Sequence, residues 1–267
     1  MQQMNFHAIQ FNAILHDSKA NRCEVERLIS EIKAIEGDFI VLQEMTDTGW
    51  SMKLDRITGI GTVDWACSLS KKYKCWLQVG WADRQGDLGK NCVTICGPTG
   101  EPVGTYTKLF TCSPMRENEY FGSGNELLIV DLGELSICPT ICYDIRFPEM
   151  YRIAALAGVD VFTVSSSWPQ RRIAHWELLL RARAVENQAF VVASNRVGKD
   201  AISLWGGSSM IISHMGEVIR QGSEKDTQTI SANIDAKFAH QWQNEFKVLK
   251  DMRKELIGSC KVTKIKA

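Results

Sequence analysis

Residues 135–152 place a cysteine at the point where a strand gives way to a helix. An apolar run rich in β-forming residues ends at Cys142, and Pro148 then opens a helical stretch that Gly158 closes. Proline at the first helical position and glycine just past the last are helix start and stop signals. A side chain in such a turn is lifted out of the sheet, and backbone N–H groups of the turn point at whatever it attacks. We therefore predict that the Cys142 thiol loses its proton readily and acts as a nucleophile.

The alternative role for Cys142 is that of a small buried hydrophobe, which is usual for an intracellular cysteine. The stretch C-Y-D-I-R-F-P-E that begins at this residue resembles the nucleophile motif of the nitrilase superfamily of carbon–nitrogen hydrolases. That family uses a Cys–Glu–Lys triad with a second Glu nearby. The resemblance therefore implies two further motifs upstream of the cysteine, in a fixed order.

Both upstream motifs are present. Residues 39–42 are an apolar run leading to Glu44, and the continuation E-M-T-D-T-G-W-S-M is similar to the ω-amidase branch in particular. Further along, Y-T-K-L-F resembles the catalytic-lysine motif and gives that role to Lys108. Two positions depart from the usual family pattern, because Gln43 stands where proline precedes the Glu and Phe110 stands where a histidine follows the Lys.

The family's roles can be carried onto these residues. Cys142 attacks the carbonyl carbon, and Glu44 takes the thiol proton, returns it to the departing amine and then activates water to split the acyl thioester. Lys108 and the backbone N–H of Tyr143 stabilise the oxyanion. An amide needs all three aids, because its carbonyl is a poor electrophile and its nitrogen a poor leaving group. The scheme uses no metal and no organic cofactor.

The resemblance also implies supporting residues. Glu117 begins the pattern E-x-x-x-F-x-x-G and matches the second Glu, with Glu119 as a nearby competitor for that role. Trp168 follows an apolar run and is a candidate either for packing or for contact with the substrate. Arg171 and Arg172 come soon after it and are candidates for binding a substrate carboxylate, or else are surface charges at the start of a helix.

The composition excludes several other classes of function. Lys and Arg total 31 and so do Asp and Glu, a balance that suggests neither nucleic acid nor an anionic membrane surface as a partner. No apolar stretch approaches the ~20 residues of a membrane span, and the start does not resemble a secretory signal, so we expect a cytoplasmic protein. Among nine cysteines and five histidines, the pairs Cys92/Cys96 and Cys138/Cys142 without a histidine cluster make only a weak metal site, so we expect reduced packing cysteines and no metal site.

Strands that alternate both with helices and with hairpins indicate an α/β fold with mixed sheets. The resemblance implies a four-layer α-β-β-α sandwich in a single domain over residues 1–267, with a tail from about residue 236, and a homodimer or larger homo-oligomer. We expect the basic segment 261–266 to be a solvated end and residues 197–206 to be a loop. The expected helices are 20–35, 63–73, 148–157 and 174–187, and the expected strands are 4–12, 39–43, 75–82, 91–97, 102–107, 127–131, 135–141, 160–165, 189–194, 208–213, 217–221 and 228–233.

The sequence thus favours an ω-amidase that hydrolyses the terminal amide of a small carboxylic acid such as 2-oxoglutaramate or 2-oxosuccinamate. Two alternatives stay open: a carbamoyl-amine hydrolase or nitrilase with the same triad, and a catalytically silent binding protein on the same fold, which the departures at Gln43 and Phe110 allow. A Cys–His protease is disfavoured, since no histidine accompanies the matched motifs.

Overall fold

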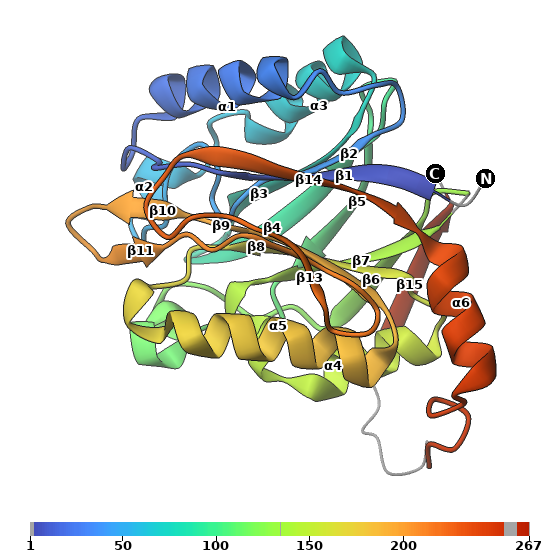
Figure 1. Cartoon of the computed structure of the whole chain (residues 1–267). Coiled ribbons are helices and arrows are strands. Elements are labelled where there is room, and N and C mark those ends of the chain that lie inside the picture. Colours follow the sequence, from blue (N-terminus) through green and yellow to red (C-terminus); the bar gives the residue numbers. More distant parts are fainter. Residues whose placement is uncertain (1–2, 134, 254–260, 267) are drawn as a thin grey trace.

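Two β-sheets pack face to face, and helices cover the outer face of each (Figure 1). The computed structural model describes residues 3–133, 135–253 and 261–266. The α-β-β-α sandwich with mixed sheets that the sequence predicts is confirmed.

The first sheet has six strands, and α1 (Ser18–Ile32) and α3 (Thr62–Tyr73) cover it. Its central strands β1, β2 and β3 are parallel, and the flanking pairs are antiparallel. A short helix, α2 (Leu54–Ile57), precedes α3. In spatial order the strands are β14 (Gln228–Asp235), β1 (Gln3–Gln10), β2 (Phe39–Val41), β3 (Trp76–Gln85), β4 (Leu88–Cys96) and β5 (Pro102–Thr107).

The second sheet has seven strands, and α4 (Pro148–Leu156) and α5 (Ile173–Asn187) cover it. Strands β7, β8 and β9 are parallel. A hairpin of β10 (Val197–Lys199) and β11 (Leu204–Gly206) and the helix α6 (Ala236–Glu245) lie outside the sheets. In spatial order the strands are β13 (Val218–Gln221), β12 (Met210–Ile212), β9 (Phe190–Asn195), β8 (Val161–Ser166), β7 (Ser136–Ile141), β6 (Glu126–Asp131) and β15 (Lys261–Lys266).

The parallel strands explain where the functional residues gather. Every residue of β2, β7, β8 and β9 is buried, as expected for strands with one face on the other sheet and one face under helices. Each of the first three leads directly to a polar or reactive residue: Glu44 after β2, Cys142 after β7 and Ser167 after β8. The carboxyl ends of these strands therefore bring the three residues to one side of the sandwich.

The segment 261–266 is not the solvated end that its charges suggest. It forms β15, which pairs in parallel with all of β6 at the edge of the second sheet. The strand was not evident from the sequence because lysines dominate the segment. Val262 and Ile265 pack against the core, while Lys264 and Lys266 are exposed. Lysine is a common means of protecting an edge strand, so a charged segment need not be solvated along its backbone.

Two further differences from the sequence predictions are local. Residues 197–206 form the β10–β11 hairpin rather than a loop. Helix α1 begins with Asp17 capping the N–H of Ala20, and it ends where Lys33 adopts a left-handed conformation, short of the predicted Ile35. Among the described residues, no helix is long and apolar enough to span a bilayer.

Candidate active site

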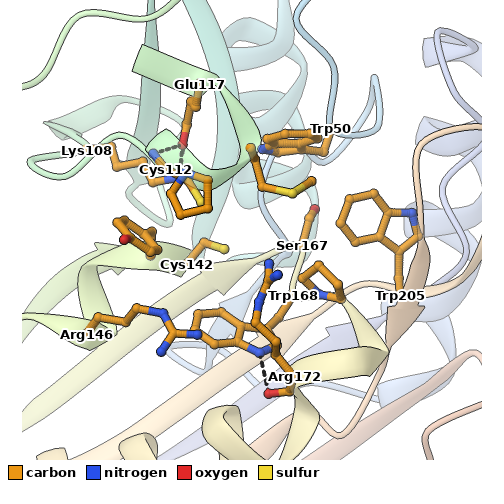
Figure 2. A pocket seen from close by; sticks show the side chains of 14 residues that line it. Trp50, Lys108, Cys112, Glu117, Cys142, Arg146, Ser167, Trp168, Arg172 and Trp205 are labelled. Carbon is orange, nitrogen blue, oxygen red and sulfur yellow. Dashed lines mark hydrogen bonds and ion pairs between the residues drawn. The ribbon is translucent and has the colours of Figure 1, made fainter.

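A cavity of about 260 Å³ opens at the strand ends, and Lys108, Glu117 and Cys142 are among the predicted residues that line it (Figure 2). Its walls are largely aromatic and apolar, with two arginines among them. The other lining residues are Trp50, Cys112, Pro114, Met115, Tyr143, Arg146, Ser167, Trp168, Pro169, Arg172 and Trp205.

Cys142 lies on a strained turn. It begins the 3₁₀ turn Cys142–Arg146 that follows β7, and its φ of 45° is in the left-handed region, which costs a non-glycine residue free energy. The buried carboxylate of Asp144 holds this turn, because Oδ2 accepts hydrogen bonds from the backbone N–H of Ile141 at 2.9 Å and from the Tyr106 hydroxyl at 2.7 Å. Its Oδ1 accepts the N–H of Phe110 at 3.0 Å. Asp144 thus joins the cysteine turn to the segment that carries the catalytic-lysine motif.

A cluster of buried side chains, which we call the floor, lies at the base of the cavity: Lys108 and Glu117 line the cavity, and Glu44 and Asn91 contact them without lining it. Lys108 Nζ lies 2.9 Å from Glu44 Oε1, and 3.0 and 2.8 Å from Glu117 Oε1 and Oε2. Burial lowers the pKa of Lys108, but the charges of Glu117 and Glu44 outweigh it and raise that pKa well above its usual value. Lys108 is therefore a fixed cation between two carboxylates.

Glu44 is fixed by the strands on both sides of it. Its Oε2 accepts the backbone N–H of Ser167 at 3.0 Å, so the end of β8 in the second sheet holds it. A Cβ at Gly80 of β3 would lie 2.7 Å from the carbonyl oxygen of Gln43 and 2.9 Å from Glu44 Cα, so glycine allows the close approach. Gln43, which replaces the family's proline, accepts the N–H of Phe11 at 3.2 Å through its side-chain carbonyl.

The thiol of Cys142 does not lose its proton as readily as its turn position predicts. Burial raises its pKa well above the usual value, Glu44 raises it further, and Lys108 opposes them both. The turn geometry alone missed this, because the desolvation of a thiolate outweighs the favourable dipoles of the turn. In the free protein Cys142 is therefore a thiol, and it would need a base in order to react as a nucleophile.

The electrostatics also indicate where that proton can go. Protonation of Glu44 would remove a negative charge that disfavours the thiolate, and it would leave the cation of Lys108 beside Cys142. The charge of the site is conserved in this transfer, so no net charge has to be buried or released. The negative charge of Glu44 therefore opposes a thiolate at Cys142, and the cation of Lys108 favours it.

Glu117 and Glu119 are the two candidates for the second acidic residue near Lys108, and the structure places only one of them there. Glu117 lies in the floor, and its Oε2 also accepts the N–H of Cys112 at 2.7 Å. Glu119 forms an ion pair with Arg116 at 2.7 Å, in which the Arg116 side chain is 73% exposed. Glu117 is therefore the acidic residue that the structure brings to Lys108.

Of the predicted substrate-binding residues, Trp168 lines the cavity and Arg171 does not. Trp168 lines the cavity, and its Nε1 donates to the carbonyl oxygen of Arg172 at 2.8 Å. Arg171 is exposed and contacts Met115 Sδ at 3.8 Å, and it does not line the cavity. Of the two arginines that the sequence offered, the 3₁₀ turn that holds both brings only Arg172 to the cavity wall. Tyr143, the predicted backbone donor, lies at the cavity.

Sequence reasoning missed several residues of the site. Asn91, in the middle of β4, donates to both glutamates of the floor. The guanidinium of Arg146 lies 4.6 Å from the ring centre of Trp168, and Arg146 lines the cavity. Trp205 comes from the β10–β11 hairpin, for which the sequence gave no signal. Within residues 3–133, 135–253 and 261–266, no group of His, Cys, Asp or Glu side chains is arranged to hold a metal ion.

The carbon–nitrogen hydrolase model matches residues 8–244 of this chain. The chain belongs to the carbon–nitrogen hydrolase family. The resemblance to the nitrilase superfamily seen in the three motifs is therefore confirmed, and the chain is an amide hydrolase of that superfamily.

Its relatives include known ω-amidases. This carbon–nitrogen hydrolase is 32% identical over 231 residues to the 2-oxoglutaramate amidase of Bacillus subtilis (strain 168), covering 85% of this chain and 89% of the relative. It is 29% identical over 239 residues to the omega-amidase YafV of Escherichia coli (strain K12), covering 88% and 91%. The crystal structure of XC1258 from Xanthomonas campestris, a CN-hydrolase superfamily protein with an arsenic adduct in the active site, matches with a TM-score of 0.89 at 26% identity, covering 97% of this chain and 100% of that one.

Proposed function

We propose that this hydrolase releases ammonia from the terminal amide of a short 2-oxo acid, such as 2-oxoglutaramate or 2-oxosuccinamate, through a thioester on Cys142. One observation carries the choice of substrate. The cavity that holds Cys142 also contains two guanidinium groups, those of Arg146 and Arg172. Among the described residues, neither forms an ion pair with a carboxylate.

The two arginines suit a substrate carboxylate bound in the same cavity as the thiol. Figure 2 shows the side chain of Arg172 rising between Cys142 and Trp205, while Arg146 lies across the face of Trp168. Burial and then the nearby charge of Arg171 lower the pKa of Arg172, so its cation lacks compensation in the free protein. A carboxylate would supply that compensation through charge-assisted hydrogen bonds, for which the guanidinium fork is well shaped.

In this proposal the floor carries the chemistry. Glu44 takes the Cys142 proton as the sulfur bonds to the amide carbon, and Lys108 with the backbone N–H of Tyr143 stabilises the oxyanion. The C–N bond then breaks as the proton passes from Glu44 to the departing ammonia. Glu44 then takes a proton from water as the water oxygen bonds to the acyl carbon. The C–S bond breaks, the acid leaves, and Glu44 returns the proton to the thiolate of Cys142. Glu117 keeps Lys108 in place throughout.

The same arginines favour a 2-oxo acid over the matching amino acid. An α-ammonium group would lie beside the two guanidinium groups, and like charges in a partly desolvated cavity repel. A 2-oxo group is an uncharged acceptor that the same guanidinium donors can bind. The ω-amidase likeness around Glu44 supports this preference independently.

Released ammonia tests the proposal directly. The pure protein is given ω-amides, carbamoyl amines and nitriles, and kcat/KM is compared for 2-oxoglutaramate and glutamine. We expect hydrolysis of the ω-amides, with 2-oxoglutaramate preferred. A preference for glutamine would contradict the role of the arginines. Turnover of a carbamoyl amine or a nitrile alone would support the second enzyme type, and turnover of no compound would support the silent binding protein.

We also propose that two copies of this chain associate through the outer face of α5. Leu178 and Val185 on that helix are 68% and 51% exposed, and Met215 and Val218 of the adjoining β12–β13 hairpin are 46% and 40% exposed. Family members commonly pair through helices. Light scattering after size exclusion should give a dimer for the wild-type protein and a monomer for Leu178→Glu. A monomeric wild type would refute this assembly.

A further inference from the structure

Asn91 lies between the two glutamates of the floor. Its Nδ2 lies 2.8 Å from Glu44 Oε1 and 2.7 Å from Glu117 Oε1. Lys108 Nζ contacts the same two oxygens at 2.9 and 3.0 Å. The four groups therefore close a ring in which each Oε1 accepts one hydrogen bond from the ammonium and one from the amide. All four side chains are buried.

The orientation of the amide follows from its partners. Carboxylate oxygens accept hydrogen bonds, so only the NH₂ side of Asn91 can face them. The other side is left without compensation, because Asn91 Oδ1 is buried and has no hydrogen-bond partner among the described residues. An unpaired buried carbonyl costs free energy, and the two charge-assisted bonds of the NH₂ group offset that cost. Asn91 thus donates two hydrogen bonds to the glutamates, while its own side-chain carbonyl is left without a hydrogen-bond partner among the described residues.

The charge balance of the floor explains why two such bonds matter. Two carboxylates share the single cation of Lys108, and like charges in a buried site favour protonation of one of them. A protonated Glu44 could not accept the proton of Cys142. A second cation would remove the excess charge, but it would also compete with the pairing of Lys108. The neutral amide supplies two donors and leaves that pairing unchanged.

We propose that Asn91 is a positioning residue that holds the side chains of Glu44 and Glu117 at a fixed separation around Lys108. Its backbone contributes as well, since the Asn91 carbonyl accepts the N–H of Lys108 at 2.9 Å. The side chain contacts no substrate and acts through Glu44. This inference rests on the proposed role of Glu44 as the base, and it adds a requirement that the Cys–Glu–Lys triad alone does not contain.

The test is the pH dependence of kcat/KM for an ω-amide that the wild-type protein hydrolyses. Asn91→Val removes both donors and Asn91→Thr keeps one hydroxyl donor in nearly the same shape, and both suit a strand position. Thr94→Val on the same strand is the matched control, because it removes buried hydrogen bonds to Trp81 and Thr105 that do not reach the floor. Thermal unfolding of each variant shows whether the fold is retained.

We expect Asn91→Val to move the acidic limb of the profile upward by about 1–2 pH units, because the ionised carboxylates lose charge-assisted bonds. Asn91→Thr should show a smaller shift, and Thr94→Val none. Asn91→Asp should lose most activity at neutral pH, since it places a third acidic group in the ring.

The inference would be overturned if Asn91→Val left the acidic limb at the wild-type pH and lowered the rate equally throughout. The inference would also be overturned if the acidic limbs of the Asn91→Val and Asn91→Thr profiles both lay at the wild-type pH. Failure of the proposed function looks different, because the wild-type protein would then hydrolyse no ω-amide at any pH.

Discussion

The floor of the cavity and its rim are built on opposite principles. The floor, Glu44 with Asn91, Lys108 and Glu117, is buried, and every charged group in it is paired. The rim, which we define as Trp50, Arg146, Trp168, Arg172 and Trp205, lines the cavity outside the floor, and its guanidinium groups have no carboxylate partner among the described residues.

The difference lies in what each region must do before substrate arrives. The floor has its charges in place in advance, which spares the reaction the cost of reorganising them. In the rim, the guanidinium groups of Arg146 and Arg172 would gain a carboxylate partner only when the substrate binds. We therefore expect changes in the floor to lower kcat and changes in the rim to alter the choice of substrate.

The largest effect is expected from removing the nucleophile or its base. Cys142→Ala should abolish turnover while the protein still unfolds cooperatively. Glu44→Gln keeps the shape of the side chain but cannot accept a proton, and it should lower kcat by at least ~100-fold. Ammonia release and circular dichroism measure the two properties. A near-normal kcat for Cys142→Ala would contradict its role as the nucleophile, and a near-normal kcat for Glu44→Gln would contradict its role as the base.

Lys108 should act in concert with Glu44. Lys108→Met removes the cation beside the oxyanion, a loss typically worth ~3–4 kcal/mol. The double variant with Glu44→Gln should be little worse than either single variant, because groups that serve one step are not additive. Two modest and additive losses would show that both residues are peripheral.

A smaller effect is expected at the rim. Arg172→Met should lower kcat/KM for 2-oxoglutaramate by about 10–100-fold, mainly through KM, since a hydrogen bond to a charged group contributes ~1.5–3 kcal/mol. Arg171→Met is the matched control, because Arg171 is exposed and lies outside the cavity. Equal losses in both variants would indicate a general charge effect, and no loss in Arg172→Met would place the substrate carboxylate elsewhere.

The sequence predicted the floor better than the rim, for a physical reason. Glu44 and Cys142 each follow an apolar strand, and Lys108 directly follows β5, so a short local motif identifies each of them. Arg172 could not be separated from Arg171 without the geometry of a 3₁₀ turn, and Trp205 comes from a hairpin that has no apolar run to signal it.

Other features depended on contacts between distant segments. Asn91 is part of the floor only because β4 pairs with β3 on one side and β5 on the other, and nothing in its local sequence marks this. The pKa of Cys142 depends on burial, so a turn motif gives its direction wrongly. Most strands and helices were predictable, because buried strands and helix start and stop signals leave strong local patterns, whereas the α-β-β-α arrangement was implied by the resemblance to the nitrilase superfamily.

Asp144 joins the turn of Cys142 to the segment that carries Lys108, and its contribution to stability should depend on pH. Burial raises its pKa from 3.8 to about 7. The folded chain therefore binds this proton more tightly than the unfolded chain, so the stability it contributes is fully present below about pH 4 and is lost as the pH rises to about 7. Asp144→Asn cannot titrate there.

The measurement is the free energy of unfolding in denaturant between pH 4 and pH 7. We expect the wild-type protein to be more stable than Asp144→Asn by an amount that shrinks as the pH rises. A difference that stays constant, or grows, would mean that Asp144 is ionised in the folded protein throughout this range.

The smallest effect is expected at Phe110, where the family commonly has histidine. Its ring stacks on Phe147 with centroids 3.7 Å apart. Phe110→His should cost about 1 kcal/mol of stability, the typical worth of an aromatic pair, and change kcat by less than about 3-fold. Thermal unfolding and ammonia release check both values. A large fall in kcat at unchanged stability would give this position a role in the chemistry.

The most direct test of the account is the mass of the intact protein, quenched in acid within the first turnovers on 2-oxoglutaramate. The account predicts a covalent species heavier than the free protein by the mass of the substrate less that of ammonia, located at Cys142 by peptide mapping and absent from Cys142→Ala. Steady ammonia release without such a species in the wild-type protein, or with the adduct on another residue, would contradict it.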